Sequence, residues 1–276
     1  MYELSNIHWF NFSVFYGRNH WSELLKKSYL FYSQNSNILK NGLFFLSEER
    51  GEHIQILFSI ENSEIEKVNS IHKKIEKAFE EFTNDYPSSS CKPFPYGQSI
   101  WHYYNNNSIV WDRFNVRDFG EYYIDFAQKT SSLIVSLLKD DTSGDNVFST
   151  CLYLCTKLTR LLKKKEIEST ITICSDYMIK HSDSYESYYL VSNYITVDPK
   201  NLVHIVQAIA EYYQEDSMEE NNYFDEWYNE AKKLYLQRGG SMYVYHTLCS
   251  VTCEHLGLRA SHQLLLYKFI AEWSSV

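Results

Sequence analysis

The stretch FFLSEERGEHIQILFSI, Phe44 to Ile60, consists of two short apolar segments around a polar turn. Such segments, rich in aromatic and β-branched residues, are typical of strands, and the turn EERGE between them predicts a hairpin. His53 opens the second strand, and Gln55 and Leu57 follow it at alternate positions. The hairpin therefore places a β-sheet in the front half of the chain.

The residues around this hairpin extend the pattern. Ile7 to Tyr16 alternates around aromatic residues and predicts a strand, and HWSELLKKSYLFYSQ, with apolar residues three and four apart, predicts a helix. Asn41-Gly42 breaks the pattern before the hairpin. A cap with early acidic residues at Ser63 begins an amphipathic helix that runs to about Phe82. The first 85 residues therefore predict the order β-α-β-β-α.

The rest of the chain changes character. Three of the four prolines lie between Asn84 and Ser99 and predict a long connection, and Trp101 to Val116 predicts a second pair of strands. From Gly120 onward the periodicity is helical, over Glu121–Lys139, Asn146–Lys164, Glu168–His181, Asn201–Tyr213, Tyr223–Gln237, Met242–His255 and Ser261–Trp273. The fold class is therefore α+β, a mixed sheet with helices packed on it, followed by a mostly helical half. We expect one domain over 1–276, with an α+β portion over 1–118 and a helical portion over 119–276.

Composition narrows the classes of function. The chain has 276 residues, 44% of them hydrophobic, which is enough for a substantial core. Its net charge of −9 argues against nucleic acid as the main partner, since phosphates need a basic surface. The start of the chain predicts no signal peptide, and no segment approaches the roughly 20 apolar residues of a membrane span. We therefore expect a cytoplasmic protein without a membrane partner.

The six cysteines predict no metal site. They lack the close pairing of zinc motifs, although Cys151/Cys155 and Cys249/Cys253 are each four residues apart, a spacing that places each pair on one helix face. Buried small apolar residues are the ordinary interpretation. Motifs for dinucleotides, phosphates, metalloproteases and serine hydrolases are missing from the sequence. We expect no cofactor and no metal, which leaves acid–base chemistry by side chains on a bound substrate.

One predicted helix, SMYVYHTLCSVTCEHLGL from Ser241 to Leu258, carries protonable residues at helical spacing. Tyr243, His246 or Thr247, Ser250 and Glu254 fall on one stripe, and apolar residues occupy the other sides. Such a stripe can hydrogen-bond an amide and transfer protons. An ordinary solvent-facing stripe is the alternative.

The order of these segments resembles the C-terminal domain of lantibiotic dehydratases and its stand-alone relatives in thiopeptide biosynthesis. That family opens with a tryptophan-containing strand and a helix, as in HWFNFSVFYGRNHWSELL, and EHIQILF resembles its PHLRLRF-like strand. VRDFGEYYIDFAQKTSSLIVSLL occupies the place of its ERYGG-like segment, and SVTCEHLG that of its HMxxNRLG-like pattern. The resemblance spans nearly the whole chain.

This sequence departs from the family at the residues that eliminate glutamate. The two strand arginines, which would hold a leaving carboxylate, are replaced by Gln55 and Leu57, and the histidine of the C-terminal pattern is Ser250. Arg117 is the one arginine kept from the ERYGG-like segment. The resemblance therefore favours the branch that has lost these residues, the thiopeptide pyridine synthases. These enzymes need no cofactor and join two dehydroalanines of a linear peptide in a formal [4+2] aza-cycloaddition, with loss of water and of the leader peptide.

The resemblance implies roles for individual residues. Ser250 would donate a hydrogen bond to the reacting amide, and Tyr243 and His246 would deliver or accept protons. A substrate-binding set would comprise His53, Gln55, Leu57, Arg117 and Glu254. Within this set, Leu57 is expected to line a pocket that has become neutral, suited to a thiazole-rich peptide.

The implied partner is a modified precursor peptide with a leader and a core that contains azoles and dehydroalanines; other biosynthetic enzymes are further expected partners. Two other functions stay open at this point. One is a stand-alone lyase that eliminates glutamate beside a tRNA-dependent glutamylating protein. The other is a non-catalytic subunit that holds the precursor for other enzymes.

Overall fold

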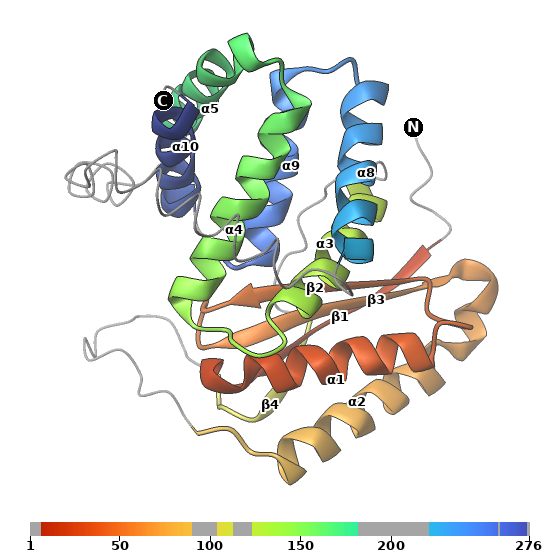
Figure 1. Ribbon diagram of the computed structural model, residues 1–276. Coiled ribbons are helices and arrows are strands. Elements are labelled where there is room, and N and C mark those ends of the chain that lie inside the picture. Colours follow the sequence, from red (N-terminus) through yellow and green to blue (C-terminus); the bar gives the residue numbers. More distant parts are fainter. Residues whose placement is uncertain (1–6, 90–103, 113–122, 182–220, 259, 275–276) are drawn as a thin grey trace. The chain divides into compact units, whose positions relative to one another are not determined.

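The computed structural model of the chain describes residues 7–89, 104–112, 123–181, 221–258 and 260–274. The chain forms two compact units, Met1–Gly144 and Asp145–Val276. The first unit contains an antiparallel sheet with helices, and the described part of the second is helical (Figure 1). The predicted α+β class is confirmed. That the whole chain is a single domain stays a prediction.

The sheet has four strands in the order β2-β3-β1-β4, and every neighbouring pair is antiparallel. The strands are β1 (Ile7–Phe15), β2 (Asn41–Ser47), β3 (His53–Glu61) and β4 (Ser108–Trp111). β2 and β3 form the predicted hairpin, and their turn uses positive φ angles at Arg50 and Gly51. Of the second predicted pair of strands, the structure describes β4; most of the remaining residues lie outside the described ranges.

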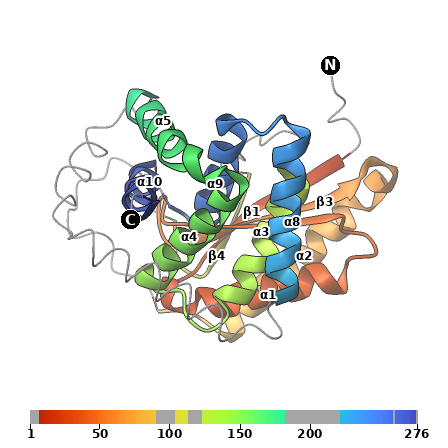
Figure 2. The same ribbon diagram turned by 45° about the horizontal axis from the view of Figure 1, so that its top comes forward.

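Two helices, α1 (Trp21–Gln34) and α2 (Val68–Asp85), cover one face of this sheet (Figure 1, Figure 2). Aromatic rings form the contact: Phe12 of β1 lies 5.2 Å from Phe79 of α2, and Phe58 of β3 lies 5.5 Å from Phe31 of α1, measured between ring centroids. A short 3-10 helix, Asn62–Lys67, precedes α2 where the sequence predicted the helix start. The predicted β-α-β-β-α order is thus confirmed.

Gly42 explains the break that the sequence shows before the hairpin. It lies on the face covered by α1, and a Cβ atom at this position would lie 2.8 Å from the ring of Tyr32. A side chain here would push α1 away from β2. Glycine is therefore required by the close approach of an aromatic ring rather than by an unusual backbone angle.

The free edge of β2 is covered by α3 (Ile124–Leu137). The backbone N–H of Phe44 donates to Ser131 Oγ at 3.0 Å, which satisfies a donor that no strand pairs. Gln128 of the same helix donates to the hydroxyl of Tyr32 on α1. Thus α3 is part of the first unit, although it falls in the portion over 119–276 that the sequence described as helical.

The second unit contains α4 (Gly144–Leu158, beginning at the last residue of the first unit), α5 (Ile167–His181), α8 (Asn221–Gln237), α9 (Met242–His255) and α10 (Ala260–Ser274). These agree with five predicted helices; the one predicted over Asn201–Tyr213 lies outside the described residues.

The ends of α9 follow from its flanking residues. Ser241 precedes it in an extended conformation, and Gly257, with φ of 67°, ends it while Leu258 N–H bonds to Cys253 O at 2.9 Å. Among the described helices, none has the length and apolar character to cross a membrane.

Candidate active site

The predicted polar stripe on α9 is confirmed as the less buried side of that helix. His246, Thr247, Ser250 and Glu254 are half-buried, and Tyr243 is exposed. The other positions between Val244 and His255 are buried, including Leu248 and Val251, so the helix buries its apolar sides as its sequence requires. The polar side chains of the stripe are therefore at least partly accessible.

A hydrogen-bond network links this stripe to α10. Gln263 Nε2 donates to Ser250 Oγ at 2.9 Å and to the hydroxyl of Tyr267 at 3.1 Å. The Tyr267 hydroxyl lies 2.8 Å from Nδ1 of His246. Ser250 and His246, one turn apart on α9, are therefore joined through two side chains of a second helix.

The chemistry of the amide fixes the direction of its own two hydrogen bonds. Its nitrogen can only donate, so the Ser250 and Tyr267 oxygens both accept from Gln263. The Tyr267 hydroxyl keeps its proton and a second lone pair, so it donates to Nδ1 of His246 in one imidazole tautomer and accepts from Nδ1–H in the other. The arrangement connects an aliphatic hydroxyl to an imidazole by a continuous path of donors and acceptors.

Burial keeps the centre of the network rigid and neutral. Tyr267 is fully buried and Gln263 is 6% exposed. Burial raises the pKa of the Tyr267 hydroxyl well above its usual value, so the phenol stays protonated at neutral pH. On another side of His246 lies the ring of Tyr177 from α5, edge-on at 5.4 Å between centroids. The imidazole is thus held by an aromatic contact as well as by its hydrogen bond.

Tyr243 and Glu254 of the predicted stripe lie at the two ends of this helix side. The Tyr243 side chain is 62% exposed, and its ring contacts that of Tyr177 at 6.5 Å between centroids. Glu254 is half-buried one turn beyond Ser250. The structure therefore joins Ser250 and His246 and leaves Tyr243 at the surface beside them.

Sequence reasoning missed Gln263 and Tyr267. They are four residues apart on α10 and so share one face of that helix. In SHQLLLYKF the glutamine is the one uncharged amide among apolar neighbours, and this was the available signal. A buried amide needs partners, which here are supplied by Ser250 and Tyr267.

The predicted sheet residues share the face opposite α1 and α2. In the register, His53 pairs with Phe15, Gln55 with Ser13 and Leu57 with Asn11, so these side chains all point to that face. Gln55 is half-buried and its Nε2 donates to Asn11 Oδ1 at 2.9 Å. Leu57 is 1% exposed. The three predicted residues of β3 therefore share one face of the sheet, and Leu57 is buried there.

His53 is completely buried at the start of β3. Its Nδ1 lies 2.9 Å from Gly51 O, and its ring lies 4.6 Å from that of Phe15 between centroids. Burial lowers the pKa of His53 to about 4, against the smaller opposing effect of the hydrogen bond to Gly51. The imidazole is therefore neutral at physiological pH and is held by the turn of the hairpin.

This face of the sheet carries neutral polar groups. Between the pairs Trp9–Ser59 and Phe15–His53, the residues of β1 and β3 that point to it are tryptophan, asparagine, serine, glutamine, leucine, phenylalanine and a neutral histidine. None of these described strand residues can form an ion pair with a carboxylate at neutral pH. Arg117, the arginine expected to remain, lies outside the described residues.

Two solved structures have folds similar to that of this chain. The chain is similar to TbtD, a pyridine synthase from thiomuracin biosynthesis, with a TM-score of 0.63 and 17% sequence identity over 97% of each chain. The predicted resemblance is confirmed at the level of the fold. A second similar structure is that of TsrL, with a TM-score of 0.52 and 8% identity over 98% of this chain and 96% of TsrL. No protein-family model and no curated protein matches the sequence.

Proposed function

We propose that this chain is a thiopeptide pyridine synthase. The observation that carries the proposal is the similarity of the fold to a pyridine synthase over nearly the full length of both chains. The neutral sheet face supports this choice over glutamate elimination, because a leaving carboxylate needs cationic partners that the described strands do not supply. The substrate would be a modified precursor peptide in the cytoplasm, with other biosynthetic enzymes acting on it as well.

The proposed reaction joins two dehydroalanines. The amide beside one of them moves its N–H proton to its carbonyl oxygen, which gives an azadiene, and this closes on the alkene of the second residue. Loss of the resulting hydroxyl as water, and of the leader peptide as a carboxamide, yields the aromatic pyridine. The tautomerisation and the two eliminations move protons, and ring closure requires the peptide to be folded into a loop, so catalysis rests on acid–base groups and orientation.

The network on α9 and α10 supplies such groups. Ser250 accepts from Gln263, which leaves its own proton to be donated to the amide carbonyl. A neutral His246 whose Nδ1–H donates to the Tyr267 hydroxyl carries its lone pair on Nε2, and in this proposal that nitrogen takes up the proton that the amide nitrogen releases. Tyr243, exposed beside them, contacts the peptide in this scheme, and Glu254, Gln55 and Arg117 contribute to substrate binding. His53 and Leu57, predicted from the sequence for the same role, are too buried to contact a peptide directly.

The sheet of the first unit is a separate candidate surface for the peptide. Asn11 and Gln55 carry amide groups on half-buried side chains, which match the donors and acceptors of a peptide backbone. Leu57 points to the same face but is 1% exposed, so it gives the peptide no accessible surface. In this proposal the sheet holds a neutral azole-rich core where relatives hold a carboxylate.

The test is the intact mass of a leader-bearing, azole-containing peptide with several dehydroalanines after incubation with the full chain. We expect a product lighter by one water and the leader carboxamide, with pyridine absorbance. An unchanged mass would contradict the proposal. A glutamylated peptide is the second substrate, and loss of glutamate from it would identify the protein as a lyase instead.

A further inference from the structure

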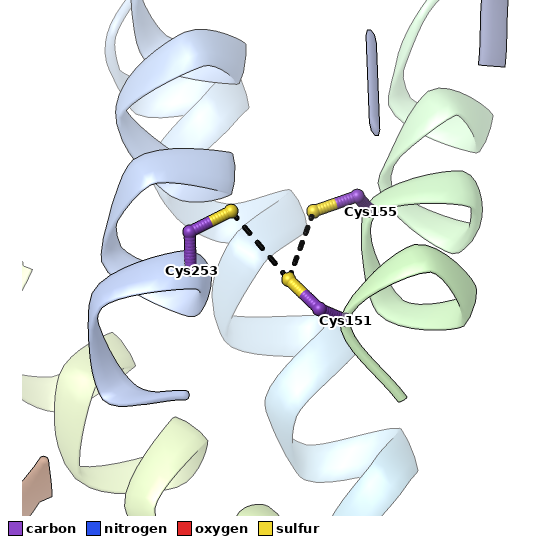
Figure 3. A group of neighbouring side chains, drawn as sticks. All are labelled: Cys151, Cys155 and Cys253. Atoms are coloured by element: carbon purple, nitrogen blue, oxygen red, sulfur yellow. Dashed lines mark hydrogen bonds between the residues drawn. The ribbon is translucent and has the colours of Figure 1, made fainter. Parts of the chain in front are cut away.

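Three cysteine thiols meet in the core of the second unit (Figure 3). Cys151 and Cys155 come from α4 and Cys253 from α9. The Cys151 sulfur lies 3.5 Å from that of Cys253 and 4.0 Å from that of Cys155, and all three sulfurs lie within 4.8 Å of one another. Each residue is at most 1% exposed, and none of them forms a disulfide.

The two helices present these thiols because of their spacing. Residues four apart share one helix face, so Cys151 and Cys155 project together from α4. α9 contributes Cys253 from its buried side and holds a second cysteine, Cys249, one turn earlier on that side. α4 and α9 lie side by side in both views (Figure 1, Figure 2), and Tyr245 of α9 donates to Cys155 O at 3.5 Å. Side chains on these two helices therefore fix the positions of the sulfurs.

The triangle of sulfurs has the dimensions of a three-coordinate metal site. A metal–sulfur bond of about 2.3 Å in a trigonal plane places the sulfurs about 4 Å apart. The two Sγ–Sγ distances of 3.5 and 4.0 Å lie close to that value. Three small apolar side chains filling a core would need no such convergence of their terminal atoms.

The surroundings select the kind of ion. The three sulfurs are buried, and a net charge is costly in such a place. A monovalent ion needs only one thiolate for a neutral complex, whereas zinc in structural sites takes four ligands. All-sulfur donor sets favour soft ions such as Cu(I).

We propose that Cys151, Cys155 and Cys253 form a binding site for one Cu(I) ion. Binding forms three Cu–S bonds and releases one proton from one of the thiols, and neither copper nor sulfur changes oxidation state. The bound ion ties α4 to α9 and stabilises the helical unit. The site is separate from the reaction proposed above and does not depend on it.

The test is an anaerobic titration of the reduced full chain with Cu(I) in competition with a chromogenic Cu(I) chelator. We expect one equivalent to be withdrawn from the chelator. Cys151→Ser and Cys253→Ser should each weaken binding by more than the roughly 100-fold that loss of an outer-shell partner costs. Cys174→Ser is the matched control, since Cys174 is another buried cysteine of this unit and lies outside the group; it should bind like the native chain.

A second measurement uses the native chain alone, so the proposal can be tested even if the serine variants fold poorly. Cu(I) should protect Cys151, Cys155 and Cys253 from alkylation, and peptide mass mapping would locate the protected residues. Failure to withdraw Cu(I), equal binding by the two serine variants, or protection of other cysteines would each overturn the proposal. Tight binding of Zn(II) in place of Cu(I) would overturn the choice of ion.

Discussion

β3 and α9 carry most of the site residues that the sequence predicted, including the positions at which it departs from the family it resembles. On β3 the substituted positions are packed inward or paired with a neighbour, since Leu57 is 1% exposed and Gln55 bonds to Asn11. On α9 the substituted position, Ser250, is half-buried and joins a network that ends on an imidazole. The strand thus carries neutral side chains that are mostly packed, whereas the helix carries a hydrogen-bonded link between a hydroxyl and an imidazole. Four measurements would break or sharpen this contrast.

Removal of either end of the α9 network should have the largest effect. We expect Ser250→Ala and His246→Ala each to lower the cyclisation rate by about 10²–10⁴-fold, the usual contribution of a positioned acid or base. Single-turnover formation of the pyridine, followed by mass, measures this. Thr247→Ala is the control, because Thr247 is half-buried on the same helix and its hydroxyl bonds to its own backbone at Tyr243 O. Unchanged rates in both variants would favour a non-catalytic peptide-binding subunit.

The contrast predicts that His53 affects stability rather than proton transfer. Its pKa of about 4 in the folded chain lies below the value near 6.5 of an unfolded histidine, so the unfolded chain binds more protons between these pH values. Stability should therefore fall by about 3 kcal/mol as pH decreases from 6.5 to 4, and no further from this group below that.

Urea unfolding at several pH values measures this slope. We expect His53→Gln to flatten it, whereas His8→Gln, at a half-buried histidine of β1, serves as the control. A slope that persists in His53→Gln would show that other groups cause the acid sensitivity.

Gln263 is expected to act as a positioning residue with an intermediate effect. Gln263→Leu removes two hydrogen bonds, and loss of correct orientation should lower kcat about 10-fold with little change in KM, as for one net hydrogen bond. Gln263→Glu keeps the shape but can no longer donate when ionised, so the Ser250 and Tyr267 hydroxyls would both donate to the carboxylate. If Gln263→Glu were fully active, donation from Gln263 to these two hydroxyls would be unnecessary for the reaction.

Tyr243 should give the smallest effect of the four. Its side chain is 62% exposed and lies outside the links between Ser250 and His246. Surface substitutions usually change free energies by at most about 0.5 kcal/mol, so Tyr243→Phe should alter kcat/KM by about twofold or less. A loss comparable to that of His246→Ala would make the Tyr243 hydroxyl a proton donor and move the site toward the surface.

Local patterns in the sequence were enough to predict the helices and strands, but not the hydrogen-bond network between α9 and α10. The hairpin over residues 44–60, the helix from 242 to 255 and the polar stripe on it follow from periodicity and glycine placement, which depend on neighbouring residues. The partners of that stripe lie on a different helix, and no short-range rule pairs Ser250 with Gln263, 13 residues away. The burial of His53 likewise depends on Phe15 and on the turn at Gly51, which only the register of the strands brings together.

The contact between Ser131 and the backbone of β2 also bears on the order in which the chain is made. Ribosomes add roughly 5–20 residues per second, so synthesis of the 70 residues from Glu61, where β3 ends, to Ser131 takes about 4–14 s. Throughout that interval the hairpin exists without the helix that covers its outer edge. An uncovered strand edge is a template for pairing with another chain. We therefore expect slow codons between β3 and α3 to lower the yield of folded protein more than slow codons after α3.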